Sequence, residues 1–198
     1  MSNDTLPLSV LAQSRAQIYD IFSEFFTGKS SQHLVDSWSE IVRFLNGIET
    51  LCEIEHTHLP AQLPKAIDID RHYAKLFLGV GVRTVPLVAS AYTNEHQMMC
   101  QEDCQALNEL YRSYGFAPTD EWASFADSVA VELAFLALLA RTETTASTQK
   151  EFLANRLIPL VSSVQQGVQS LKAEPIETIF AALLNFMKAD KQLLSQPV

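Results

Sequence analysis

The chain has 198 residues, of which 47% are hydrophobic, so it is long enough to form one domain with a sizeable core. It contains only 6 glycines and 8 prolines, which argues against an all-β protein dense in turns. The formal net charge of -9 argues against nucleic acid as the main partner, because binding to phosphates requires clustered Lys and Arg side chains. An acidic surface of this kind attracts a basic partner and repels anionic lipid.

The sequence shows no targeting or membrane-spanning segment. Its first residues, MSNDTLPLSV, contain neither the basic nor the apolar part of a secretory leader. The longest apolar run, residues 129–140, is short for a membrane span and contains Glu132, so we expect a buried helix there. The cysteines number 3, and an odd number does not suggest a disulfide framework. We therefore expect a cytoplasmic protein without stable membrane insertion.

The N-terminal part of the chain predicts three helices. The first covers residues 8–27 and has a wide apolar stripe, made of Leu11, Ile18, Ile21, Phe22, Phe25 and Phe26. The polar side chains of this helix lie largely off the stripe; they are Arg15, Gln17, Asp20 and Glu24. Gly28 suits the end of this helix, and Ser30 or Ser31 suits the start of the second. We expect Asn46-Gly47 to close the second helix and a short third helix to cover residues 48–55.

The stretch from Tyr73 to Glu95 is the one around which the chain is organised. A helix over residues 65–78 feeds it, and Gly79 and Gly81 then supply the backbone freedom that ends the helix. Pro86 lacks a backbone N–H, so a helix is not expected to continue through it. The result is an apolar connection of roughly a dozen residues, which is longer than usual between helices and typical of a functional segment.

The rest of the chain predicts further helices and no strand. One covers residues 94–114, and the next starts at Thr119 as its N-cap and runs to about residue 141. Residues 148–151 form a capping box, and Pro159 is expected to kink or divide the helix that follows. Pro175 opens the last helix, residues 176–194. We expect an all-α single domain with lobes 1–114 and 119–198 around a hinge at 115–118.

Two loose groups of metal-ligating residue types stand out, and both are read as structural. One is His96, Cys100 and Cys104, spaced four apart on one helix; the other is Cys52, His56 and His58. One helix face seldom completes a tetrahedral zinc site, and no paired C-x-x-C is present. The sequence also lacks the serine-nucleophile, P-loop and dinucleotide-binding motifs. We predict no catalytic residues, no metal site and no cofactor.

Two acidic residues lie in or beside the apolar run. Asp127 precedes it, and Glu132 interrupts it, where an ionised carboxylate needs a partner. The candidate partners are Arg83, Arg156 and Arg15. A structural ion pair and a ligand-binding role remain as alternatives at this point.

The motif Tyr73-x-x-Leu76-Phe77-x-Gly79, followed by Pro86, Ser90 and Tyr92, resembles the signature of the TorD/DmsD family of redox-enzyme maturation chaperones. Three further segments are similar to the family in order and spacing: Arg15-x-x-x-Tyr19, Asp127-Ser128-x-x-x-Glu132-Leu133, and the stretch from Phe152 to Pro159 with the closing helix through Asp190. The chain departs from the family in one place, where Ser128 replaces the usual His, and this makes a different client possible.

The resemblance implies an all-helical fold that is monomeric or a domain-swapped homodimer. It implies binding to the twin-arginine signal peptide of a molybdopterin-containing oxidoreductase, whose catalytic subunit is held in the cytoplasm until its cofactor is inserted. The implied signal-peptide contacts are Tyr73, Leu76, Phe77, Gly79, Pro86, Ser90, Tyr92 and Asp127, with Ser128 and Glu132 in support. The alternatives are a nucleotide- or metal-dependent helical enzyme, or an oligomerisation module that binds no peptide.

Overall fold

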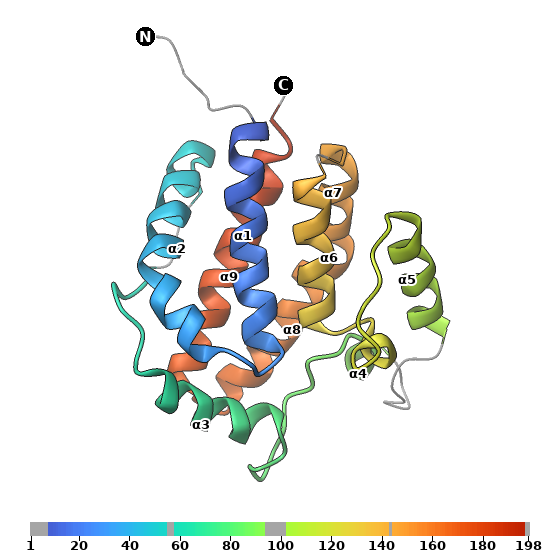
Figure 1. Ribbon diagram of the computed structural model, residues 1–198. Helices are drawn as coiled ribbons and strands as arrows, with labels where there is room; N and C mark the ends of the chain where they lie inside the picture. The colour runs from blue at the N-terminus through green and yellow to red at the C-terminus, as the bar shows by residue number, and fades with distance from the viewer. Residues whose placement is uncertain (1–7, 55–57, 94–101, 143, 197–198) are drawn as a thin grey trace.

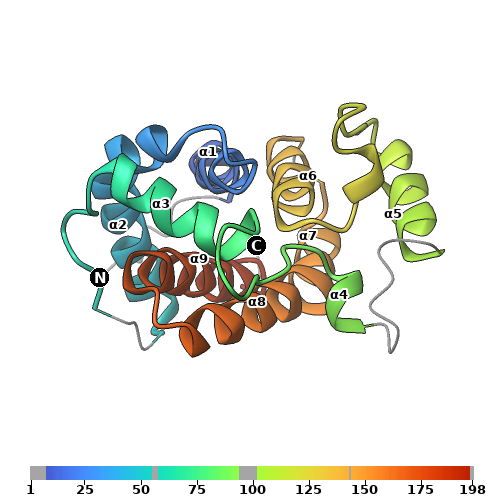
Figure 2. The ribbon, with the colours of Figure 1, turned by 90° about the horizontal axis from the view of Figure 1, so that it is seen from below.

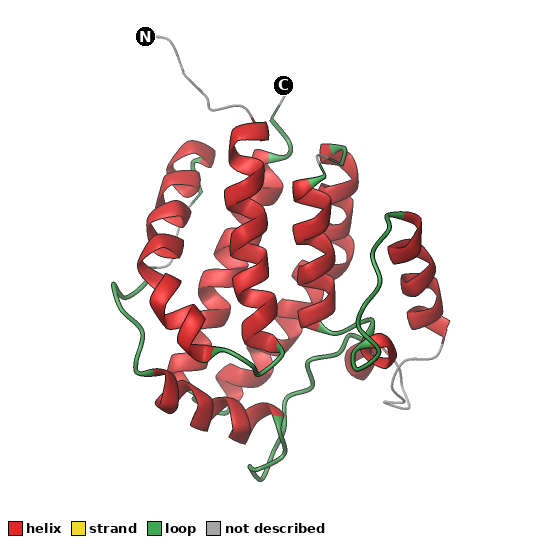
Figure 3. Ribbon diagram, viewed as in Figure 1, coloured by secondary structure: helices red, strands yellow, loops and turns green. Residues whose placement is uncertain are grey.

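The computed structural model describes residues 8–54, 58–93, 102–142 and 144–196. Its α-helices are α1 Leu8–Phe26, α2 Ser31–Cys52, α3 Ala66–Phe77, α4 Ser90–Thr93, α5 Glu102–Ser113, α6 Val129–Arg141, α7 Ala146–Phe152, α8 Ile158–Ser170 and α9 Glu174–Leu193. A 3-10 helix covers Ala123–Phe125, and a π-helix covers Leu153–Leu157 between α7 and α8. The described part of the chain contains no strand, so the predicted all-α fold is confirmed (Figure 3).

The bundle is built around α1 and α9, which lie side by side at its centre (Figure 1). The α1 helix packs against α6, while α2 and α8 pack against α9. The α3 helix lies across the lower end of the bundle, against α2 and α9 (Figure 2). The α5 helix stands to one side of α6. This arrangement leaves the connection after α3 to pass beneath the bundle toward α4 and α5.

The apolar stripe of α1 is buried as predicted, but Arg15 is also buried. Phe22, Phe25 and Phe26 are at most 1% exposed, and Arg15 is 2% exposed. Packing of α1 on α6 includes a hydrogen bond in which the Ser23 hydroxyl donates to the carbonyl of Ala130 at 2.8 Å. The placement of Arg15 off the stripe was therefore wrong, and its partners are described below.

The predicted break at Asn46-Gly47 was wrong, because α2 runs without interruption from Ser31 to Cys52. Leu45 and Ile48 are both buried on the side that faces the bundle. Burial of this continuing stripe outweighs the cost of one helical glycine, which is about 1 kcal/mol. The helix is capped by Ser30, whose side chain accepts from the His33 N–H, and it ends at Glu53 in a left-handed conformation.

The capping box predicted at residues 148–151 was also wrong. The N-cap of α7 is Thr145, whose hydroxyl accepts from the backbone N–H of Thr148. Pro159 divides the next helix as predicted, and the division takes the form of the π-helix that ends at Leu157. Proline removes one N–H from the ladder and crowds the preceding turn, which accounts for the wider turn just before it.

Thr119 does not begin a long helix, contrary to the prediction. Its carbonyl accepts from the backbone N–H groups of Trp122 and Ala123, which forms a turn, and α6 begins only at Val129. The N-cap of α6 is Ser128, whose side chain accepts from the N–H of Val131 at 3.3 Å. The ten residues before α6 are therefore available to pair with another segment.

Among the described residues, none of the helices combines the length and the apolar character that a membrane crossing requires.

Candidate functional site

The connection between α3 and α5 forms a crossover, defined here as residues 78–93, which passes beneath the bundle (Figure 2). Its first turn is fixed to the end of α3. The N–H groups of Leu78 and Val80 donate to the carbonyl of Ala74 at 3.2 and 3.4 Å. Gly79 has a positive φ of 75°, which a side chain would strain. The helix therefore ends at these glycines, as the sequence predicted, and hydrogen bonds to its last turn close the turn that follows.

A second attachment holds the middle of the crossover. The N–H of Val85 donates to the carbonyl of Leu76 at 2.8 Å. Val85 is 4% exposed and lies on α8, where a Cβ added to Gly167 would come within 2.8 Å of its side chain. The loop between Leu78 and Val85 is therefore pinned at both ends.

The third attachment joins the crossover to the start of α6. Val88 and Ser128 form an isolated antiparallel bridge, the Ala89 N–H donates to the Asp127 carbonyl at 3.0 Å, and the Val129 N–H donates to the Leu87 carbonyl at 2.9 Å. This backbone pairing uses the residues before α6, which explains why the helix does not start at Thr119.

Asp127 completes this third attachment with its side chain. Its Oδ2 accepts from the backbone N–H of Ser90 at 2.8 Å, and the Sγ of Cys104 lies 3.5 Å from Oδ1. The Asp127 side chain is only 1% exposed. A carboxylate that accepts from the first N–H of α4 orders that turn, so Asp127 holds the crossover in place.

A pocket of about 200 Å³ opens beside this attachment, between the crossover and the π-helix region. Its lining includes Ala89, Tyr92, Asp127, Asn155 and Arg156. Tyr92 is 40% exposed, and its hydroxyl donates to the carbonyl of Pro86 at 2.8 Å. Burial of the ring raises the pKa of Tyr92 to about 12. The pocket therefore presents an aromatic ring, hydrogen-bonding groups and one cation.

That cation, Arg156, is paired with Glu132. Its Nη2 donates to Glu132 Oε1 at 3.0 Å, and the Glu132 side chain is fully buried. Burial raises the pKa of Glu132 to about 7, against the opposing effect of Arg156. Of the three arginines considered from the sequence, Arg156 is thus the partner in the structure. Within the described part of the chain, Glu132 Oε2 has no hydrogen-bond partner.

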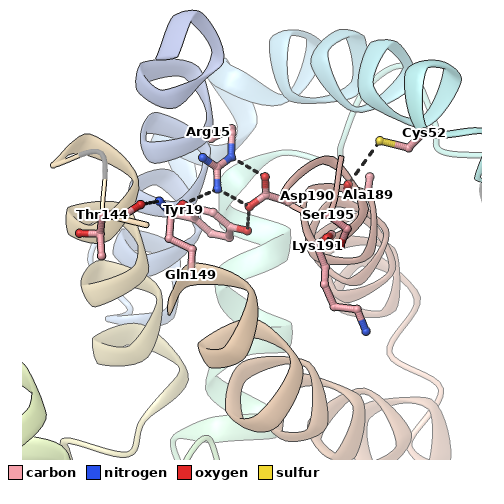
Figure 4. Close-up of polar contacts among 9 residues, drawn as sticks. All are labelled: Arg15, Tyr19, Cys52, Thr144, Gln149, Ala189, Asp190, Lys191 and Ser195. Atoms are coloured by element: carbon pink, nitrogen blue, oxygen red, sulfur yellow. Dashed lines mark hydrogen bonds and ion pairs between the residues drawn. The ribbon is translucent and has the colours of Figure 1, made fainter. Parts of the chain in front are cut away.

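Arg15 instead belongs to a buried network between α1, α7 and α9 (Figure 4). Its guanidinium donates to both carboxylate oxygens of Asp190 and, at 2.7 Å, to the side-chain oxygen of Gln149. The Tyr19 hydroxyl donates to Asp190 Oδ2 at 2.6 Å, and burial raises the pKa of Tyr19 well above its usual value. A bidentate pair surrounded by further donors and acceptors fixes the relative position of three helices.

The predicted site residues fall into two groups. The first group lies on α3 and contributes to the core: Tyr73 and Leu76 are buried, and Phe77 is half-buried. The Tyr73 hydroxyl donates to the carbonyl of Phe26 at 2.8 Å, and its ring contacts Phe25 and Phe77. The second group consists of Pro86, Ser90, Tyr92, Asp127 and Ser128, which the crossover brings together at the start of α6. Gly79 lies between the groups, in the exposed turn.

Sequence reasoning singled out the crossover but not the basic residues around its exposed tip. Leu78, Val80 and Val82 are 66%, 73% and 105% exposed. Val82 lines a second pocket, of about 500 Å³, whose lining also includes Lys75, Arg83 and Lys172. These cations come from three separate segments, so no local pattern could have assembled them.

The two groups of metal-ligating residue types are only partly described. His96, Cys100 and His56 lie outside the described residues. Among the described ones, no three His, Cys, Asp or Glu side chains are arranged to hold a metal ion.

Comparison with known proteins gives two matches. A family model described as nitrate reductase delta subunit matches residues 38–166. The chain is 22% identical over 156 residues to the chaperone protein TorD of Aliivibrio salmonicida (strain LFI1238), in an alignment that covers 73% of each chain. No solved structure matches the chain.

Proposed function

The chain belongs to the nitrate reductase delta subunit family, which includes TorD-like chaperones, and on this premise we propose that it is a chaperone for the maturation of a redox enzyme. The family match confirms the TorD/DmsD resemblance inferred from the motifs, and it is the observation that carries the proposal. In this proposal the protein acts in the cytoplasm by binding a polypeptide, and it needs no catalytic residue or cofactor of its own.

The ligand that we propose is the twin-arginine signal peptide of a molybdopterin-containing oxidoreductase. Such a leader combines an arginine pair with an apolar segment. The crossover supports this proposal with the ring of Tyr92, which is 40% exposed beside a pocket that Ala89 and Leu160 also line. The net charge of -9 supports attraction of a basic segment to the surface of the chain.

The predicted contact residues take two different roles in this proposal. Pro86 and Tyr92 lie on the exposed side of the crossover and contact the peptide, and Gly79 shapes the turn that leads to them. Ser90, Asp127 and Ser128 act indirectly, because they hold the crossover against α6 through the hydrogen bonds described above. The remaining predicted residues support the site through their packing in the core; they are Tyr73, Leu76, Phe77 and Glu132.

Binding of a labelled leader peptide tests the proposal. The leader of a molybdenum reductase from the same genome should bind at micromolar or tighter affinity, and replacement of its two arginines by lysine or glutamine should weaken binding. Asp127→Ala should weaken binding because it removes the acceptor for the Ser90 N–H. Asp127→Asn is the matched control, since its amide oxygen can still accept that bond. A chain that is indifferent to both the arginine changes and Asp127→Ala would refute the proposal.

The hinge at 115–118 and the oligomeric state are part of the same proposal. Gly115 ends α5 with a positive φ of 71°, and this supports a point at which the chain can change direction. Exchange of lobes 1–114 and 119–198 between two protomers would give the domain-swapped homodimer expected of some members. Size-exclusion chromatography with light scattering, with and without leader peptide, distinguishes it from the monomer.

A further inference from the structure

The pocket beside the tip of the crossover is basic, although the chain as a whole is acidic. Its lining includes His72 and Lys75 from α3, Arg83 from the crossover, and Lys172 from the turn between α8 and α9. None of the residues that line it is acidic. Three of the 14 Lys and Arg residues therefore converge on one pocket of about 500 Å³ in a chain of net charge -9.

Within the described residues, these cations form no ion pair. No described acidic side chain forms an ion pair with Lys75, Arg83 or Lys172, whereas Arg15, Arg71, Arg141 and Arg156 each have one. The Nδ1–H of His72 donates to the carbonyl of Asp68 at 2.8 Å, so Nε2 is the ring nitrogen that remains for a ligand. The pocket thus offers several unused donors.

Compensation of helix ends explains only part of this cluster. Lys75 lies in the last turn of α3, and Lys172 follows the end of α8, where cations are stabilised by the helix dipole. Arg83 belongs to neither helix. Lys172 also has a positive φ of 52°, a conformation that is unfavourable for a non-glycine residue. A lysine held in this conformation at the rim of a pocket suggests a role beyond the turn itself.

The backbone of the crossover keeps the apolar part of the pocket exposed to solvent. Leu76 is buried within the lining, and Val82 is fully exposed at its rim. Gly81 passes so close to α3 that an added Cβ would lie 2.5 Å from the carbonyl oxygen of Lys75. With Val85 fixed on α8, the short loop between Gly81 and Val85 holds Val82 out of the core. Exposed aliphatic side chains that are fixed in this way mark a contact surface.

We propose that this pocket binds an acidic and apolar polypeptide segment, as a second surface distinct from the one that binds the leader. Carboxylates of the segment pair with Arg83, Lys75 and Lys172, and its aliphatic side chains cover Val82 and the neighbouring tip of the crossover. The arginine pair of a leader is repelled here by like charge. An isolated phosphate group would use the cations but leave the exposed valines in water, so a polypeptide fits the surface better.

Selection from a random peptide library displayed on phage tests this proposal without knowledge of the partner. The library is selected on the wild-type chain and counter-selected on the double variant Arg83→Glu/Lys172→Glu. The selected peptides should combine Asp or Glu with Leu, Ile, Val or Phe. Enrichment of basic sequences, or failure to enrich any sequence that the double variant does not also bind, overturns the proposal.

The consensus peptide is then synthesised and measured by fluorescence anisotropy. Arg83→Glu should weaken its binding by about tenfold or more, and rising salt should weaken binding to the wild type. Arg112→Glu on α5 is the matched control, because Arg112 is exposed and lies outside the pocket, and it should leave binding unchanged. Equal loss in both variants would overturn the assignment to this pocket.

Two further measurements separate the other sources of negative charge and the leader. Displacement of the peptide by inorganic phosphate at matched ionic strength would assign the pocket to phosphate, and sedimentation of the chain with phosphatidylglycerol vesicles but not with neutral ones would assign it to a membrane; either result overturns the proposal.

The leader peptide should bind Arg83→Glu at least as tightly as the wild type. A leader that binds no form of the chain refutes the proposed function and leaves the peptide selection as an independent result.

Discussion

Glu132 should make the stability of the fold fall as the pH rises through neutrality. Its side chain is fully buried, and burial raises its pKa from 4.5 to about 7, while pairing with Arg156 acts in the opposite direction. A carboxyl group with a raised pKa binds a proton more tightly in the folded chain than in the unfolded chain. Its favourable contribution is therefore complete below about pH 4.5 and is lost as the pH rises through about 7.

The size of the effect follows from the two pKa values. Each pKa unit corresponds to about 1.4 kcal/mol, so the raise from 4.5 to about 7 corresponds to about 3 kcal/mol of unfolding free energy. Glu132→Gln keeps the shape of the side chain but cannot ionise. The wild type should therefore lose about 3 kcal/mol relative to this variant between about pH 4 and pH 9.

Urea unfolding across this pH range measures the difference directly. Other titrating groups are common to the two proteins, so their contributions largely cancel when the two unfolding free energies are subtracted. Glu40→Gln on the exposed face of α2 is the matched control, and its curve should run parallel to that of the wild type. Parallel curves for Glu132→Gln as well would refute the reasoning, because they would mean that Glu132 has the same proton affinity in the folded and unfolded chains.

Other changes test the structural roles of single residues, with urea or thermal unfolding as the measurement. Asp190→Asn leaves the Arg15 guanidinium buried beside a neutral group and should cost about 3–5 kcal/mol; a loss below about 1 kcal/mol would contradict the structural importance of the pair. Gly79→Ala should cost about 1 kcal/mol because of its positive φ, whereas Gly47→Ala within α2 should stabilise the chain by up to about 1 kcal/mol. Ser128→Ala removes the N-cap of α6 and should cost about 1 kcal/mol, while Ser128→Asp should retain most of the stability.

The sequence predicted helix ends correctly where a glycine, a proline or an N-cap residue at the end itself determines the boundary. Gly28 ends the first helix and Ser30 caps the second, as their types indicated. Pro159 and Pro175 lie where a helix is divided and where one begins. In these cases the backbone constraint belongs to the residue itself, so one sequence is sufficient.

The wrong boundaries arose where distant parts of the chain decide the structure. Thr119 has the chemistry of an N-cap, but the residues after it donate and accept backbone hydrogen bonds with the crossover, and the helix is delayed to Val129. Gly47 has the chemistry of a helix end, but packing of α2 on α9 carries the helix through it. Tertiary contacts of this kind outweigh local preferences of about 1 kcal/mol.

The candidate site was predictable in part. The crossover and its glycines and proline stood out because a long apolar connection is unusual, and Glu132 stood out because it interrupts an apolar run. The role of Asp127 as an acceptor for the Ser90 N–H depends on residues 37 positions apart, and the pair of Arg15 with Asp190 on residues 175 positions apart. Pairs so far apart in the sequence produce no spacing pattern from which they could have been predicted.

The turn before α6 has a practical consequence for experiments on the crossover. Trp122 is half-buried in this turn, against Phe125, while the other indole of the chain, Trp38, is 1% exposed and donates to the carbonyl of Pro60. A soluble quencher such as iodide would therefore reach Trp122 far more readily than Trp38. Asp127 and Val129, which follow this turn, share backbone hydrogen bonds with Ala89 and Leu87 of the crossover. The quenchable part of the tryptophan emission should therefore change when a ligand shifts the crossover.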